Sequence, residues 1–569
     1  MNRNTQAHFA QTPSLKMGRS KFDRSFTNKT TFNAGDLIPF YVDCGIMPGD
    51  TVKMNTAQVV RMMTPVAPVM DNANLDTYFF FVPYRLIWEH FQEFMGENKT
   101  EPWYQQTEYE IPQIEAPAST GWTKGSLADY MGYPTKVAGY KASALPFRAY
   151  ALIWNEWFRD QNLKNPCYIH MGDADITGVD ILDPNLDYVT DVEKGACPAK
   201  AAKYHDYFTS ALPSAQKGPA VNVPLGKSAP IVYVEPELEY SSGMPKIPDT
   251  LHGEHSMYTM NGSGVIGMYY DNNGSPSATG LVNHSYGLEA DLSLAVGATV
   301  NQLRQAFAIQ KFYERQAIGG TRYIELIKSH FSVTNPDFRM QRPEYLGGFQ
   351  TPININQVVQ TDATAQQLGG SYKEVGGQEV WEWSMSDLSP QGNTAAYSLT
   401  SGKNKDLFTH SFTEHGILMG LAVVRTVHTY QQGLNRQFSR KKWVDFYWPE
   451  FANLGNVGIL NKEIYLDGSS NDEQVFGYQE AWADYRYFPD IVTGEMRSNY
   501  DQSLDVWHWA DDYNTLPSLG SDWIDETKEN IARTIAVQDH DQFFGDFYFN
   551  AIYTRPMPLY SVPGLIDHH

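Results

Sequence analysis

The sequence predicts an all-β sandwich with long loop insertions and a few helices. Two short runs, 75–82 and 415–427, are rich in strand formers and apolar on both faces of an extended chain, which is typical of buried strands. Near the carboxyl end, 543–553 places large apolar residues at every second position, which indicates a strand with one buried face. Turn-rich stretches of Gly, Pro, Ser and Asp separate such runs, so we expect many short strands and long loops.

Composition limits the classes of function. The chain has 35 tyrosines and 13 tryptophans, more than one core needs, so part of them is expected where the protein meets other proteins or sugars. A large core with ordinary surface tyrosines remains the alternative. The net charge of −22 excludes a protein that binds nucleic acid over its whole surface, but it allows a local basic patch.

The cysteines and the apolar runs bear on the compartment. Cys44, Cys167 and Cys197 lack metal-ligand spacing, and we expect free thiols in a protein assembled in a reducing cytosol. Residues 1–16 contain no apolar signal core, and the longest apolar run, 417–424, is too short to cross a bilayer. We therefore expect a soluble chain made inside a cell, with no membrane insertion.

Residues 1–30 form a basic amino-terminal arm. Its basic residues are Arg3, Lys16, Arg19, Lys21, Arg24 and Lys29, against the single acid Asp23. Polar residues separate these charges, so the arm has little to fold around and should be extended or disordered alone. We expect it to contact phosphates through charge rather than to read bases, with an ordinary solvated tail as the alternative.

Two helices are predicted to begin at prolines. After the strand at 75–82, Pro83 opens a helix whose apolar stripe includes His90 and which Gly96 ends. We interpret His90 as a packed core histidine rather than a metal ligand, because no partner has ligand spacing. A second helix starts at Pro146, and its tryptophan-rich stripe is typical of a core or an interface.

Composition changes near His170, and 171–297 reads as a surface insertion with its own small fold. Within it, 226–228 imitates part of a phosphate-binding loop and 252–255 collects metal-ligand residue types. Neither has the full pattern of a site. The remaining chain, 31–170 and 298–569, is predicted to form the sandwich core with extended loops.

The stretch 299–350 contains the longest predicted helix. Residues 299–318 lack Gly and Pro, and their apolar positions cover more than one face, so we expect a helix buried on several sides. Gly319 and Gly320 end it, and a strand is expected at 323–327. Further on, 352–360 is another strand candidate, and 361–405 is a Gln/Gly/Ser-rich excursion.

The densest basic cluster lies at 436–443. Its candidate nucleic-acid-binding residues are Arg436, Phe438, Arg440, Lys441, Lys442 and Trp443. Cations could neutralise phosphates while the aromatic side chains stack on bases without sequence preference.

No catalytic motif is present: the sequence has no GxSxG, no CxxC pair and no dinucleotide-binding glycine pattern. Acidic residues are abundant, so a carboxylate pair with glycosidase spacing stays open, as does a divalent cation held between subunits. We therefore predict no catalytic residues and no cofactor. The alternative is an acidic, aromatic-rich β-sandwich glycoside hydrolase or carbohydrate-binding protein.

Motifs along most of the chain resemble the major capsid proteins of the gokushoviruses, small single-stranded-DNA bacteriophages of the Microviridae. Among them are GGTRY at 319–323 and QRPEYLGG at 341–348. The others lie at 64–72, 79–83, 94–97, 145–150, 154–163, 314–315, 412–416, 447–450, 476–480, 485–487, 507–508, 555–558 and 563–568. Gln316, Ile318 and the segment 374–394 depart from the family pattern.

The resemblance implies a viral jelly roll whose copies build a T=1 icosahedral shell around circular single-stranded DNA. The insertion 171–297 would then form a surface protrusion used in host recognition, and the basic arm and the cluster at 436–443 would face inward. Implied partners are a small basic DNA-packaging protein, a scaffolding protein, a pilot protein and a bacterial surface receptor. The implied location is the virion, with assembly in the cytoplasm of the host bacterium.

Overall fold

The computed structural model describes residues 18–97, 108–219, 231–233, 246–249, 253–259, 266–268, 288–290, 300–319, 328–332, 341–359, 370–375, 378–383 and 394–560. The chain divides into two compact units. The first comprises Met1–Ala215 and Gly319–His569, and the second comprises Gln216–Ile318. Residues 171–215, which the sequence assigned to the insertion, therefore belong to the first unit.

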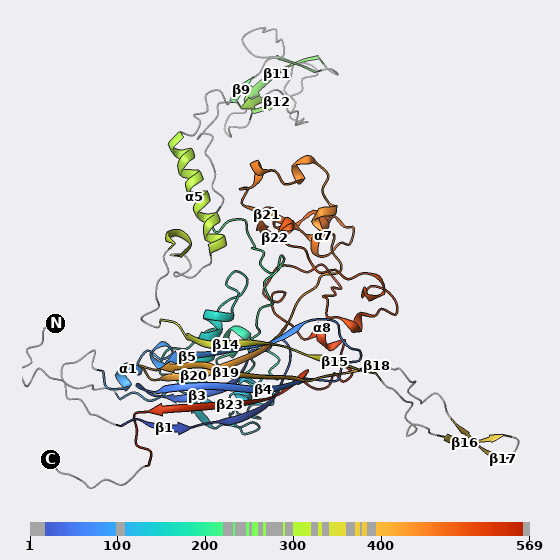
Figure 1. Cartoon of the computed structure of the whole chain (residues 1–569). Coiled ribbons are helices and arrows are strands. Elements are labelled where there is room, and N and C mark those ends of the chain that lie inside the picture. The colour runs from blue at the N-terminus through green and yellow to red at the C-terminus, as the bar shows by residue number, and fades with distance from the viewer. Residues whose placement is uncertain are drawn as a thin grey trace, which may run out of the picture. The chain divides into compact units, whose positions relative to one another are not determined.

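The first unit is built on two antiparallel sheets (Figure 1). The first sheet has five strands in the order β1-β23-β4-β19, with β2 also paired to β23. Its strands are β1 (Ser20–Asp23), β2 (Phe26–Phe32), β4 (Thr51–Met62), β19 (Thr400–Ser411) and β23 (Phe543–Arg555). The second sheet has four strands in the order β14-β5-β20-β3. Its strands are β3 (Ile38–Ile46), β5 (Ala73–Pro83), β14 (Glu344–Pro352) and β20 (Gly416–Thr426).

The order of the eight long strands identifies the topology. In chain order they are β2, β3, β4, β5, β14, β19, β20 and β23. The first sheet takes the first, eighth, third and sixth of these, and the second takes the second, seventh, fourth and fifth. The chain thus crosses between the sheets at almost every connection, as two Greek keys wound into a jelly roll do. The predicted all-β jelly-roll sandwich is confirmed.

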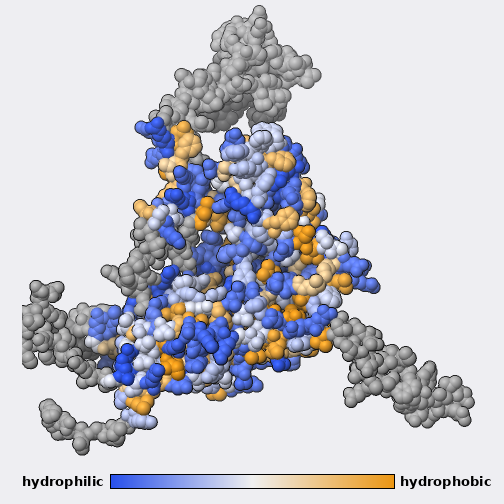
Figure 2. Space-filling model, in the orientation of Figure 1, coloured by the Kyte–Doolittle hydropathy of each residue, from blue (hydrophilic) through white to orange (hydrophobic). Residues whose placement is uncertain are grey.

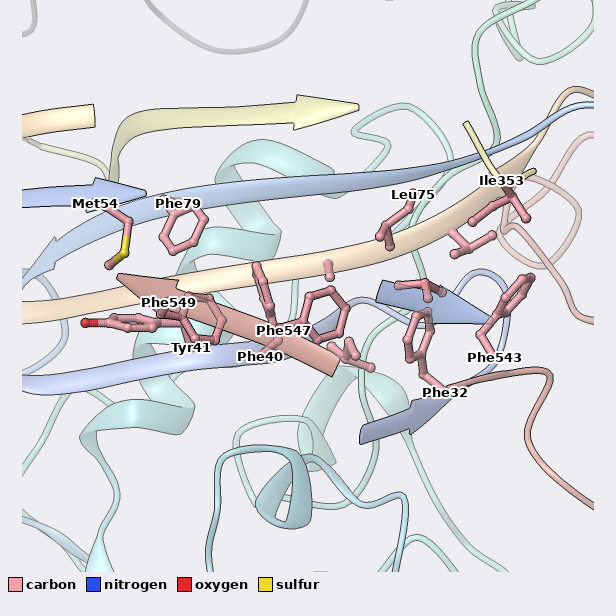
Figure 3. Packing of buried hydrophobic residues seen from close by; sticks show 14 of the residues in the cluster. Phe32, Phe40, Tyr41, Met54, Leu75, Phe79, Ile353, Phe543, Phe547 and Phe549 are labelled. Carbon is pink, nitrogen blue, oxygen red and sulfur yellow. The ribbon is translucent and has the colours of Figure 1, made fainter. Parts of the chain in front are cut away.

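The main core lies between the two sheets (Figure 3). Along β23, Phe543, Phe547 and Phe549 point into it and alternate with more exposed residues, so the predicted alternation is confirmed. Phe40 on β3 packs edge-on against Phe547, with ring centroids 4.9 Å apart. Rings from both sheets therefore meet in this layer, and their burial gives the sandwich its main stabilisation.

A second core covers the outer face of the second sheet. In β20, Met419 and Leu421 point into this layer, whereas Leu418 and Ala422 point into the main core. The predicted strands at 75–82 and 415–427 are confirmed, and both are buried on their two faces. Helix α3 (Leu145–Ile153), with proline in its first turn as predicted, packs here and continues into a π-helical segment, Trp154–Phe158.

The predicted helix after Pro83 is interrupted. A 3-10 turn at Tyr84–Leu86 ends at Ile87, and only the short α1 (Phe91–Phe94) follows before Gly96. The interpretation of His90 as a packed core histidine is wrong. Since the break removes the continuous stripe, the His90 ring instead lies half-buried, stacks on Tyr109 with centroids 4.4 Å apart, and faces Asp173 at 2.9 Å.

Short elements occupy the long connections of the first unit. After β5 come β6 (Gln113–Glu115), α2 (Leu127–Tyr130), β7 (Lys141–Ser143), β8 (Ile176–Thr177) and α4 (Tyr188–Asp191). After β14 come β15 (Ile355–Val359), β16 (Gly370–Val375), β17 (Gln378–Trp383) and β18 (Thr394–Ser398), so the strand predicted at 352–360 is confirmed. After β20 come β21 (Asn456–Leu460), α7 (Asn461–Ile464) and β22 (Val475–Glu480), which contribute to a third, smaller core, and then α8 (Glu529–Ala532), whose Ile531 belongs to the main core.

The second unit contains the long helix α5 (Val300–Gly319). Its described strands are β9 (Ile231–Tyr233) paired with β13 (Leu288–Ala290), and β10 (Lys246–Asp249), β11 (Gly253–Thr259) and β12 (Ile266–Met268) in one sheet. The predicted helix is confirmed, but its predicted burial is wrong: Phe307 is 63% exposed, and Phe312 and Ile318 are exposed too. The apolar residues of α5 predicted burial, but the sequence did not identify a segment that packs against them. The strand predicted at 323–327 lies outside the described residues.

Candidate nucleic-acid and protein interfaces

The described part of the basic arm lies along the first sheet. Arg3 and Lys16 are outside the described residues. Arg19 donates hydrogen bonds to the Gly49 carbonyl and, at 2.8 Å, to Thr51 Oγ1. Lys21 is exposed on β1. The arm therefore reaches the fold at the edge where β1 pairs with β23.

The Arg24 side chain is held by contacts within the fold. Its guanidinium lies 2.5 Å from Asp43 and 4.8 Å from the centre of the Tyr553 ring. The Tyr553 hydroxyl donates to the same carboxylate at 2.7 Å. Burial lowers the pKa of Arg24, but Asp43 together with Tyr553 and Tyr41 outweighs burial and raises the pKa above its ordinary value. The arginine stays charged, yet that charge is already neutralised inside the protein.

Arg436 is held in the same way. It donates to the Gly458 carbonyl at 2.8 Å and to the Tyr207 hydroxyl at 3.3 Å, and its Nε lies 3.7 Å from Glu463. Burial lowers the pKa of Arg436, while Glu463 raises it, and the net pKa is raised. This arginine joins β21 and α7 to the chain that follows β20.

Arg440 is the second structural arginine of the cluster. It pairs with Asp484, and both side chains are mostly buried. Its guanidinium also lies 4.2 Å from the centre of the Tyr485 ring and 5.6 Å from that of Phe446. A cation enclosed by a carboxylate and two rings holds neighbouring loops together and is not available to bind a phosphate.

The other four residues of the cluster lie at the surface. Lys441 and Lys442 are exposed, and their backbone amides donate to Asp445. Phe438 is 73% exposed and Trp443 is 67% exposed. The structure therefore separates the predicted cluster into two structural arginines and an exposed group of two lysines and two rings.

A surface patch of rings adjoins this exposed group. Trp443 lies 6.4 Å from Trp448, and Tyr447 lies 6.2 Å from Tyr485, between ring centroids. With Phe446, these residues form what we call the aromatic patch, all of it between 40% and 70% exposed. Figure 2 shows that hydrophobic residues are scattered among hydrophilic ones over the visible surface of the chain. Of the patch residues, only Trp443 was among the binding residues predicted from the sequence, although the aromatic run at 446–448 was a usable signal. Exposed aromatic clusters of this kind mark protein–protein contacts.

The described residues offer no obvious catalytic or metal centre. Burial raises the pKa of Cys167 and of Cys197 to about 12, so both thiols are protonated near neutral pH, and Cys44 is a free, exposed thiol. A cavity of about 480 Å³ borders Cys167, but the lysine beside it, Lys164, is paired with Asp525 at 2.6 Å. No group of three metal-ligating side chains occurs in the described ranges. Of the two imitated sites, 226–228 and His252 lie outside them.

Among the helices that the structure describes, none combines the length and the apolar character needed to span a bilayer.

Comparison with known proteins gives a consistent result. The family described as "Capsid protein (F protein)" matches residues 10–368 and 365–565. The capsid protein VP1 of Bdellovibrio phage phiMH2K is 43% identical over 580 residues, covering 99% of this chain and 98% of the relative. VP1 of Spiroplasma virus 4 is 39% identical, covering 96% and 95%, and VP1 of Chlamydia phage 1 is 37% identical, covering 98% and 97%.

Proposed function

The chain belongs to the F-protein family of microvirus capsid proteins, and from that membership we propose that its copies assemble into a T=1 icosahedral shell around circular single-stranded DNA. As a member of this family the protein is a structural component of the virion and not an enzyme. Its complete jelly roll, a fold common in viral shells, supports the proposal.

The aromatic patch is the observation that supports self-assembly most directly. Large rings left in water cost free energy, and one fully buried aromatic side chain contributes about 1.5–3 kcal/mol. A shell subunit makes heterologous contacts that close around rotation axes, so much of its surface becomes interface. Burying Trp443, Tyr447 and Trp448 against a neighbouring copy would recover that free energy.

Electron microscopy of the expressed protein tests assembly. The wild-type chain should give particles of uniform diameter. Trp443→Asp should leave the subunit folded but prevent particles, because a charge would be buried at the contact. Trp443→Phe keeps an aromatic ring and serves as the matched control that should still assemble. A wild-type protein that stays monomeric under all conditions would contradict the proposal.

The second unit, Gln216–Ile318, is the proposed host-recognition element, protruding from the shell towards a bacterial surface receptor. Its separation as a compact unit supports this role, since a module outside the sandwich can vary without disturbing the core. Replacing it with a short Gly-Ser linker should preserve particles and abolish adsorption to host cells. Unchanged adsorption of such particles would contradict this role.

Assembly is proposed to occur in the cytoplasm of the host bacterium. The proposed partners are a scaffolding protein, a small basic DNA-packaging protein and a pilot protein. Their support is the family membership alone. Co-purification of such proteins with particles from infected cells would test each one separately, because each would appear as its own band.

A further inference from the structure

The outer face of the first sheet is open. Along β4, Met54, Val60 and Met62 are buried in the main core, whereas the alternate residues Lys53, Val59 and Arg61 are exposed. Two rings on β23 share this outer face: Phe544 is 37% exposed and Tyr548 is 42% exposed. A face with exposed rings at its centre has room for a partner.

The charge of this face is opposite to that of the chain. Its cations are Lys21, Lys29, Lys53, Arg61, Lys403 and Lys405, and the acids on the same strands are Asp23, Asp406 and Asp546. The chain as a whole has a net charge of −22, so an excess of basic residues on one sheet face is a local feature.

The acidic side chains of this face already have ion-pair or hydrogen-bond partners within the subunit. Asp546 lies 3.5 Å from Lys29, and Asp406 lies 2.6 Å from Lys53. Asp23 accepts hydrogen bonds from the backbone and side chain of Ser25. At the rim, Asp541 accepts a hydrogen bond from Thr31. No ion pair within the described residues involves Lys21, Arg61, Lys403 or Lys405, so their charges are available to an external anion.

Strand register brings cations and rings together from distant parts of the sequence. Arg61 is directly opposite Phe544, and neighbouring strands lie about 4.8 Å apart. Ala57 is opposite Tyr548 on one side and Lys403 on the other, so this lysine and this ring lie about 10 Å apart across β4. Lys405 is also exposed on β19, in the irregular stretch between Asn404 and Phe408 where the register with β4 shifts.

We propose that this face, which we call the basic sheet face (Lys21, Arg61, Lys403, Lys405, Phe544 and Tyr548), is the surface that binds single-stranded nucleic acid. The proposal rests on the proposed function, since it names the subunit surface turned towards the genome. Single strands are held without sequence preference by cations along the backbone and by rings that stack on bases. Two copies of this chain could not meet through this same face, because each would present the same positive charges.

The basic sheet face differs from the cluster at 436–443 in how its charge is used. There, Arg436 and Arg440 are neutralised by carboxylates, and the two exposed lysines lie beside the aromatic patch. Lys441 and Lys442 thus form a matched control for Lys403 and Lys405, because both are pairs of exposed lysines on the same protein.

The test measures binding of the purified, unassembled full-length protein to a fluorescent oligo(dT) strand over a range of NaCl concentrations. Loss of two phosphate contacts should lower the salt slope by about 1.4 and the affinity at 0.1 M salt by about 20-fold. We expect this for the double variant Lys403→Gln/Lys405→Gln and no change for Lys441→Gln/Lys442→Gln. Equal losses in both variants, or a larger loss in the second, would overturn the proposal.

Electron microscopy and absorbance of particles from the same variants separate this proposal from the proposed function. Lys403→Gln/Lys405→Gln should form normal shells with a lower ratio of absorbance at 260 nm to that at 280 nm. Shells lost in this variant alone would make the basic sheet face a contact between copies and overturn the inference. Absence of particles from the wild-type chain would instead overturn the proposed function.

Photocrosslinking gives a readout that needs no substitution. Wild-type protein bound to an oligonucleotide containing 5-iododeoxyuridine should crosslink at Phe544 or Tyr548, as identified by mass spectrometry. Crosslinks confined to Phe438 and Trp443 would assign nucleic acid to the other surface and contradict the proposal.

Discussion

The two sheets of the sandwich share one core but differ in what covers their outer faces. The second sheet is covered by α3 and the segments around it, so Met419 and Leu421 are fully buried. The first sheet leaves Val59 and Tyr548 about 42% exposed in the same layer position. Side chains on the covered face stabilise the fold. Those on the open face can be substituted without unfolding the subunit and can contact a partner.

The same contrast holds for charged groups. In the covered region that follows β20, the His428 ring lies between Asp511 and Glu526, each 2.9 Å from one ring nitrogen. On the open face, Lys53 and Asp406 form a pair whose side chains are 50% and 72% exposed. Burial strengthens the interaction between charges and raises the cost of leaving one without a partner, so the two groups should respond very differently to substitution.

The largest effect is expected from a charge placed on the covered face. Leu421→Lys would bury an ammonium group among apolar side chains, a change that costs more than about 4 kcal/mol and should leave little folded protein. Val59→Lys makes the same type of change on the open face and should alter the free energy of unfolding by less than about 0.5 kcal/mol. Soluble yield and urea unfolding measure both.

The two substitutions together test whether the outer faces of the two sheets differ in burial. If Val59→Lys unfolded the subunit as Leu421→Lys does, the first sheet would have to be covered in the folded protein. Equal tolerance of both variants would mean that the second core contributes little.

Strands buried on both faces were readable from the sequence because their apolar residues are continuous. The runs that became β5 and β20, and the alternation that became β23, were each predicted. The strand β4 was not, because Thr56 and Gln58 face inward and weaken its apolar alternation. A polar side chain inside the sandwich is decided by its partners, such as the hydrogen bond from Gln58 to Thr351 at 2.9 Å, and those lie far along the chain.

The candidate site shows the same limit. Residues 436–443 are basic in the sequence, but Asp484 and Glu463, which neutralise its two arginines, follow much later in the chain. Nothing in the sequence connects Arg61 with Lys403, whereas the sheet register and the strand alternation place both on the same outer face. Sequence composition locates charged residues, whereas only the fold shows which of them already have a partner.

The second largest effect on the free energy of unfolding is expected at His428. Burial lowers the pKa of its ring, but Asp511 and Glu526 outweigh burial and raise the pKa to about 10, from 6.5. The unfolded chain loses this proton near pH 6.5, while the folded chain keeps it until about pH 10. The stabilisation is therefore complete below pH 6.5 and is lost as the pH rises to about 10, at about 1.4 kcal/mol per pH unit.

Urea unfolding between pH 6 and 10 measures this slope. His428→Gln removes the titrating group and leaves two carboxylates facing each other, so it should cost about 3–5 kcal/mol at pH 6 and flatten this part of the pH profile. An unchanged slope in His428→Gln would show that the buried ring is neutral.

The smallest effect is expected at the pair on the open face. Lys53→Gln removes its bond to Asp406, and because both side chains are exposed the free energy of unfolding should fall only slightly at low salt. Half-molar salt should remove the difference, since screening acts fully on exposed charges. Lys200→Gln is the covered counterpart: Lys200 lies 2.5 Å from Asp36, both side chains are mostly buried, and the loss should be larger and persist in salt. A salt-resistant loss in Lys53→Gln would show that the first sheet is shielded from solvent in the single subunit, and the face could then not be open to nucleic acid.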